Sequence, residues 1–111
     1  MQLSQMQIDF LRHHWKFSGE FKFHRRLANY VYFSELLGKE VVLRLTGLDH
    51  RQIHEIESEL HWMDYLTNNG MKIARPVHTT ENKLAVNVPG ETPFTACVFE
   101  KALGNLLSDS V

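Results

Sequence analysis

The chain has 111 residues, a formal net charge of −1, and a composition that is 43% hydrophobic and 23% charged. This length suits one compact domain, and this composition is typical of a folded globular protein rather than a disordered one. The near-neutral charge gives no electrostatic reason to expect nucleic acid or an anionic membrane as a partner. The bulk properties therefore predict one globular domain with neither kind of partner.

The sequence also predicts a cytoplasmic location. The only cysteine, Cys97, cannot form an internal disulfide and lies within an apolar run, as expected in a reducing compartment. No apolar stretch reaches the roughly 18 residues of a membrane-spanning helix. The first residues carry neither a basic start nor a long apolar segment, so no secretory signal is expected.

A short helix is predicted at the N-terminus. Ser4 can cap it, and apolar residues recur at spacings of three and four as far as Trp15. Ser18-Gly19 breaks this pattern. We therefore expect a helical segment over residues 1–18, followed by a domain over residues 19–103.

Three strand-like runs follow, from Phe21 to Leu27, from Tyr30 to Glu35 and from Glu40 to Thr46. Apolar and charged residues alternate in the first run, which is typical of a half-buried strand. Short turns, among them Leu37-Gly38-Lys39, join the runs. We therefore expect an antiparallel meander.

A long amphipathic helix is predicted from about Asp49 to Asn69. Asp49 can accept a hydrogen bond from a first-turn N–H, and Gln52 stands three residues on, as in a capping box. Gly70 can end the helix in a left-handed conformation. Apolar residues follow a 3-4-3 spacing along one face and form a stripe of Ile53, Ile56, Leu60 and Met63.

Two more strands are predicted, from Leu84 to Val88 and from Phe94 to Glu100, after an extended segment at Arg75-Pro76-Val77. Residues 104–111 are predicted to be a linker. Together the elements predict an α+β fold. It has a five-stranded antiparallel sheet with one long helix packed against it and a short N-terminal helix.

Five segments stand in a recognisable order: Asn29-Tyr30-Val31-Tyr32, Val42-Leu43-Arg44-Leu45, Ser58-Glu59-Leu60, Gly70-Met71-Lys72-Ile73-Ala74-Arg75-Pro76-Val77 and Cys97-Val98-Phe99-Glu100-Lys101-Ala102-Leu103-Gly104. In this order and spacing they resemble the N-terminal lobe of the aminoglycoside phosphotransferase and choline kinase-like family. This family is a branch of the protein-kinase-like fold that phosphorylates small molecules. The resemblance covers roughly Gly19 to Leu107.

The resemblance implies that Arg44 contacts nucleotide phosphates and pairs with Glu59 on the helix, since fixed positive charge favours phosphoryl transfer. Many members of the family have lysine at the position of Arg44, but a guanidinium also binds phosphate, in a forked manner. Helical geometry favours Glu59 over Glu55 and Glu57, because the neighbours of Glu59 one turn away border the apolar stripe. The alternatives are a surface arginine on an edge strand and a solvated glutamate.

The resemblance also implies that the linker after the last strand offers backbone groups to adenine, with Phe99, Glu100 and Ala102 as candidates. The expected cofactor is ATP with Mg²⁺, and the expected substrate is a hydroxyl of a small molecule. The loop between the first two strands, near Arg25 to Asn29, contains no glycine. No phosphate-binding residue is therefore assigned to that loop.

The sequence contains no His-x-Asp-x-x-x-x-Asn loop, and no second metal-binding Asp follows. The family carries both in its C-terminal lobe. We therefore expect no catalytic residue, no metal ligand and no phosphotransferase activity in this chain alone. The alternative function is a non-enzymatic binding or self-assembling module, which would form a homo-oligomer through the uncovered face between the lobes.

Two other patterns are interpreted as coincidental. His50, His54 and His61 could share one helical face and hold a metal ion, but the His-Glu-x-x-His pattern is missing. Solvated helix histidines are therefore expected. A set of aromatic residues could stack on RNA bases, but the near-neutral charge favours packing in the core; the set is Phe21, Phe23, Tyr32 and Phe33.

Overall fold

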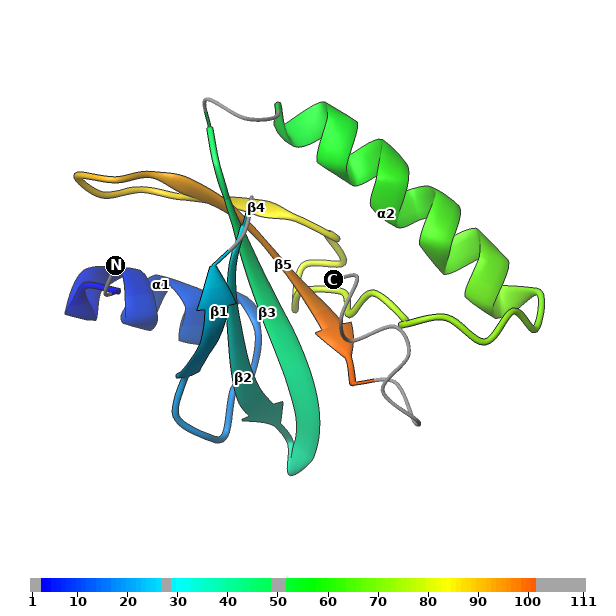
Figure 1. Cartoon of the computed structure of the whole chain (residues 1–111), viewed down its shortest axis with the longest axis horizontal. Coiled ribbons are helices and arrows are strands. Elements are labelled where there is room, and N and C mark those ends of the chain that lie inside the picture. Colours follow the sequence, from blue (N-terminus) through cyan, green and yellow to red (C-terminus); the bar gives the residue numbers. More distant parts are fainter. Residues whose placement is uncertain (1–2, 27–28, 49–51, 102–111) are drawn as a thin grey trace.

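The computed structural model describes residues 3–26, 29–48 and 52–101. In these ranges the chain forms one five-stranded antiparallel sheet with strand order β1-β2-β3-β5-β4 and two helices (Figure 1). The elements are α1 (Gln5–His14), β1 (Lys22–Arg26), β2 (Tyr30–Leu36), β3 (Lys39–Gly47), α2 (Ile53–Asn68), β4 (Val86–Val88) and β5 (Phe94–Glu100). The predicted α+β class is confirmed. The last strand has the predicted bounds, and the strand expected from Leu84 begins two residues later.

Helix α1 covers one face of the sheet. Ser4 begins it as predicted: its hydroxyl accepts from the Gln7 N–H at 3.2 Å, and the Gln7 amide oxygen accepts from the Ser4 N–H at 3.1 Å. This reciprocal pair is a capping box. Leu11 and Trp15, both fully buried, pack in one core cluster with the sheet residues Leu43 and Leu45. The helix therefore shares its core with the sheet, while the boundary between residues 18 and 19 stays a prediction.

The turn between β2 and β3 contains two residues with positive φ, Leu37 at 53° and Gly38 at 82°. Leu36 and Lys39 pair across it, so the loop has two residues. Positive φ at both positions is the geometry of a tight hairpin turn that matches strand twist. Glycine adopts a positive φ without steric cost, whereas leucine adopts it at a cost in conformational energy.

Helix α2 begins later than predicted. Its first residue is Ile53, and the residue before it, Gln52, donates its backbone N–H to a Glu55 carboxylate oxygen at 3.1 Å. The prediction of a start near Asp49 was therefore wrong by about one turn. The pair Gln52 and Glu55 has the same three-residue spacing as the pair Asp49 and Gln52, so the sequence offers two overlapping capping-box patterns. Asp49 itself lies outside the described residues.

The end of α2 was predicted correctly. Gly70 has φ 91°, its N–H donates to the Thr67 carbonyl at 3.1 Å, and the Met71 N–H donates to the Leu66 carbonyl at 3.0 Å. These two bonds form a Schellman motif, in which the left-handed residue is usually glycine.

Helix α2 covers the other face of the sheet. Ile56 and Leu60 are fully buried and contact Cys97 and Phe99 of β5. Successive residues of a strand point to opposite faces, so β5 contributes Ala96 and Val98 to the α1 side and Cys97 and Phe99 to the α2 side. Each fully buried aliphatic side chain of this kind contributes about 1.5–3 kcal/mol. The sheet is thus the shared middle layer of a three-layer domain.

Candidate functional site

Arg44 lies in the middle of the central strand β3. It pairs with Val31 of β2 on one side and with Cys97 of β5 on the other. Strand alternation turns its side chain away from Leu43 and Leu45 and towards α2. The side chain is only 8% exposed. Arg44 is therefore not a surface arginine on an edge strand.

Glu59 of α2 faces Arg44. One Glu59 carboxylate oxygen, Oε1, lies 3.7 Å from the Arg44 Nη2, and the Glu59 side chain is 36% exposed. The distance is too long for a direct hydrogen bond, so the contact is a loose ion pair. The guanidinium also lies over the Phe99 ring, with 5.2 Å from Cζ to the ring centroid. The structure thus brings Arg44, Glu59 and Phe99 together.

The guanidinium keeps two unused donors. Arg44 Nε and Nη2 are buried and have no hydrogen-bond partner among the described residues. Leaving a buried donor unpaired costs about 1–3 kcal/mol, and more for a charged group, so folded proteins seldom leave one without a reason. A buried cation with free donors in a forked arrangement suits an anion with several acceptor oxygens.

The predicted adenine contacts fall at the end of the sheet. Phe99 and Glu100 belong to β5 rather than to a linker, and Ala102 lies outside the described residues. The Glu100 N–H already donates to the Arg75 carbonyl at 2.9 Å. The Phe99 side chain is buried beneath Arg44, so its role in the structure is to support the guanidinium. Contact between this segment and adenine stays a prediction.

A hollow of about 510 Å³ opens at the same end of the sheet. Lys101 lies at its rim, where the Nζ is 2.9 Å from Glu40 Oε2 and 5.0 Å from the centroid of the Phe33 ring. The His24 ring stacks on Phe33 with centroids 4.3 Å apart. The sequence pattern does not connect these residues, because they come from β1, β2, β3 and the segment after β5. The hollow is lined by Glu20, Lys22, Phe33, Ser34, Glu35, Gly38, Glu40, Val41 and Lys101.

The other expectations about surfaces and ions can be compared with the described part of the chain. Within it, no group of three His, Cys, Asp or Glu side chains could hold a metal ion, and no helix is long and apolar enough to cross a membrane. Residues 94–99 of the last strand, β5, are all buried. Large exposed apolar side chains lie instead on the outer face of α2, at Trp62 and Tyr65.

A sheet of this strand order, with a buried cation on its central strand facing a carboxylate on the packed helix, defines the N-terminal lobe of a kinase-like fold. Solved structures match it over nearly the whole chain, and the predicted resemblance to aminoglycoside phosphotransferase-like kinases is confirmed. The chain thus has the fold of their N-terminal lobe.

One match is an amicoumacin kinase in complex with AMP-PNP, Ca²⁺ and Ami, with a TM-score of 0.81, 27% identity, and coverage of 93% of this chain and 32% of that one. Another is a microcompartment-associated aminopropanol kinase, with a TM-score of 0.70, 24% identity, and coverage of 89% and 32%. A third is a spectinomycin phosphotransferase in complex with ADP and spectinomycin, with a TM-score of 0.61, 19% identity, and coverage of 89% and 29%.

This chain therefore spans about a third of the length of these solved structures. No protein-family model matches the sequence, and a search of curated proteins gives no match. The likeness is thus carried by the fold more than by the sequence.

Proposed function

We propose that this chain is the nucleotide-binding lobe of a kinase that transfers phosphate from ATP to a hydroxyl of a small molecule. The observation that carries the proposal is the Arg44 guanidinium, which is buried, paired only loosely with Glu59, and left with free donors at Nε and Nη2. The fold it sits in is shared with a kinase solved with AMP-PNP.

In this proposal Arg44 donates its free N–H groups to phosphate oxygens of the nucleotide. Glu59 and the Phe99 ring hold the guanidinium in place before the phosphate arrives, and the groups that cover the buried Nε and Nη2 move aside when the phosphate binds. A charge-assisted bond of this kind is worth about 1.5–3 kcal/mol. The adenine end of the nucleotide would lie towards the end of β5, near Phe99, Glu100 and Ala102.

The expected metal is Mg²⁺, which when bound to the phosphates neutralises charge that develops during transfer. The donors of the Arg44 site fit the anionic phosphates rather than the metal, because a guanidinium cannot ligate a cation. This lobe would accordingly hold and orient the nucleotide. We propose that the acceptor hydroxyl and the metal are bound by a second lobe of the kinase.

Calorimetric titration of the 111-residue chain with AMP-PNP and Mg²⁺ tests the proposal. We expect binding by the wild type and a loss of about tenfold or more in affinity for Arg44→Met, from the missing charge-assisted bond. Arg44→Lys should lose less, because it keeps the charge and loses only the fork. The control is Lys72→Met, which removes an exposed cation. Equal affinities of wild type and Arg44→Met would refute the proposal.

A further inference from the structure

The segment that joins α2 to β4 lies alongside the C-terminal half of β5 and is bonded to it. We call residues 74–80 the strap. The Val77 N–H donates to the Val98 carbonyl at 2.8 Å, and the Arg75 carbonyl accepts from the Glu100 N–H at 2.9 Å. Because β5 is paired along its length with β3, the strap has a fixed position relative to the strand that carries Arg44.

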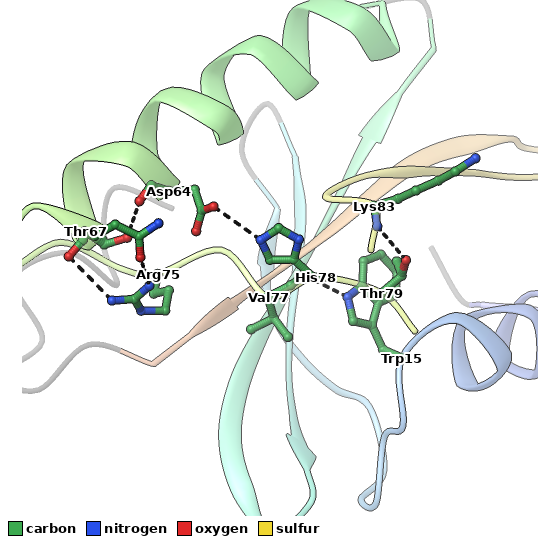
Figure 2. A network of polar contacts seen from close by, with 9 residues as sticks. Trp15, Asp64, Thr67, Arg75, Val77, His78, Thr79 and Lys83 are labelled. Carbon is green, nitrogen blue, oxygen red and sulfur yellow. Dashed lines mark hydrogen bonds and ion pairs between the residues drawn. The ribbon is translucent and has the colours of Figure 1, made fainter. Parts of the chain in front are cut away.

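The strap is also fixed to the N-terminal helix (Figure 2). The indole N–H of Trp15, a fully buried residue, donates to the Val77 carbonyl at 3.0 Å. The Thr80 N–H donates to the His14 carbonyl at 2.9 Å. On this side, backbone groups of the strap are thus bonded to groups that have little freedom to move.

Two strap side chains reach α2 on the other side, as Figure 2 shows. The His78 Nε2 lies 3.3 Å from the Asp64 Oδ2. The Arg75 guanidinium donates to the Asn68 amide oxygen at 2.8 Å and to the Thr67 carbonyl at 3.5 Å. These contacts all fall in the C-terminal half of the helix.

The rest of α2 is attached by an apolar seam. Ile56 and Leu60 are the fully buried apolar residues of the helix. Glu59 lies between them in sequence, and Trp62 and Tyr65 on the outer face stack on each other with about half or more of each side chain exposed. Ile53 and Met63 are partly buried against the same cluster, so the seam spans residues 53–63 and leaves the last turn of the helix to be held by the strap contacts.

We infer that His78 and Asp64 are positioning residues, which hold α2 at the angle that keeps Glu59 within reach of Arg44. This inference rests on the proposed function of the Arg44 site. Asp64 is five residues from Glu59, or about 7.5 Å along a rigid helix, so displacement at one is transmitted to the other. Apparent affinity for a ligand falls in proportion to the fraction of molecules in the competent arrangement.

Nucleotide affinity provides the first test. In the 111-residue chain, His78→Gln and Asp64→Asn should each weaken AMP-PNP binding by about two- to fivefold, which corresponds to the loss of one partly exposed polar contact. His78→Lys should restore most of the affinity, because the lysine ammonium can also donate a hydrogen bond to the Asp64 carboxylate. His61→Gln, which changes an exposed histidine of the same helix, is the matched control and should bind like the wild type.

A double-mutant cycle separates positioning from general stabilisation. If His78 acts through Glu59, His78→Gln should cause no further loss in a Glu59→Gln background. A merely stabilising contact would lower the melting temperature but leave affinity unchanged well below the transition. Additive losses with Glu59→Gln, or an unchanged affinity for His78→Gln, would overturn the inference.

A nucleotide-free measurement keeps this inference distinct from the proposed function. The NMR signal of the Arg44 Nε–H group should shift in His78→Gln and stay in place in His61→Gln. An unmoved signal in His78→Gln overturns the positioning role, whether or not nucleotide binds. Failure of the wild type to bind AMP-PNP overturns the proposed function and leaves the positioning role to be decided by the Arg44 signal.

Discussion

Replacement of Arg44 by methionine should make the protein more stable while it removes the proposed function. The guanidinium is only 8% exposed, and its two free donors cost about 1–3 kcal/mol. Against this stand a loose ion pair at 3.7 Å with the partly exposed Glu59, worth at most about 1 kcal/mol, and the contact with the Phe99 ring, worth about 0.5–1 kcal/mol. Methionine fills a similar volume without a charge. We expect the free energy of unfolding to rise by about 1 kcal/mol.

Urea denaturation followed by circular dichroism measures this change, and thermal melting should show a rise of about 4 °C. More than a third of the Glu59 side chain is exposed, so water can solvate its carboxylate in the variant. Lys72→Met, at an exposed position, should leave the free energy of unfolding within about 0.5 kcal/mol of the wild type. A loss of more than 1 kcal/mol in Arg44→Met would refute the reasoning, because Arg44 would then be a structural residue.

Leu37→Asn should stabilise the β2–β3 hairpin by about 1 kcal/mol, since asparagine tolerates the positive φ that leucine adopts there. Gly38→Ala should destabilise the hairpin by a similar amount. Melting temperatures that rank the two variants in the opposite order would contradict this reasoning. Burial, and secondarily the nearby Tyr30, raises the pKa of Tyr32 above its ordinary value near 10. Because the folded state then holds the Tyr32 proton more tightly, the contribution of the protonated Tyr32 to the free energy of unfolding is complete below pH 10 and falls as the pH rises further. The same alkaline loss of stability in Tyr32→Phe as in the wild type would show that Tyr32 is not the source of the loss. The 111-residue chain should bind nucleotide without transferring phosphate to a small-molecule hydroxyl, because it contains no His-x-Asp-x-x-x-x-Asn loop, and turnover by the pure chain would disprove this.

The fold could be predicted largely because local patterns agree with the tertiary structure. The alternation of apolar and polar residues, together with the turn residues, predicted most strand bounds. The left-handed Gly70 predicted the end of α2. The start of α2 was misplaced because two overlapping capping patterns share one spacing, and only the tertiary context selects Gln52. β4 came out shorter than predicted since only Val86–Val88 pairs with β5 in a ladder.

The pairing of Arg44 with Glu59 was predictable in part. Helical periodicity places Glu59 beside the apolar stripe, and alternation places Arg44 opposite Leu43 and Leu45. The unused donors of Arg44 and the support from Phe99 were not predictable, because both depend on how closely the β5 side chains approach. The same holds for His78 and Asp64, which are fourteen residues apart and meet only because the strap runs back along the helix.

The strand order has a consequence for how the protein folds. β1, β2 and β3 are neighbours in the chain and can pair early, but Arg44 and its partner Cys97 in β5 are separated by 53 residues. Contacts between residues so far apart in the sequence form slowly, because a large loop must close before the contacts contribute to stability. An intermediate with only the first three strands would therefore expose β3 as an edge, with Arg44 on it and no Phe99 beneath. Nucleotide should consequently slow unfolding of the complete domain without speeding its folding, since the anion site forms only when β5 closes the sheet.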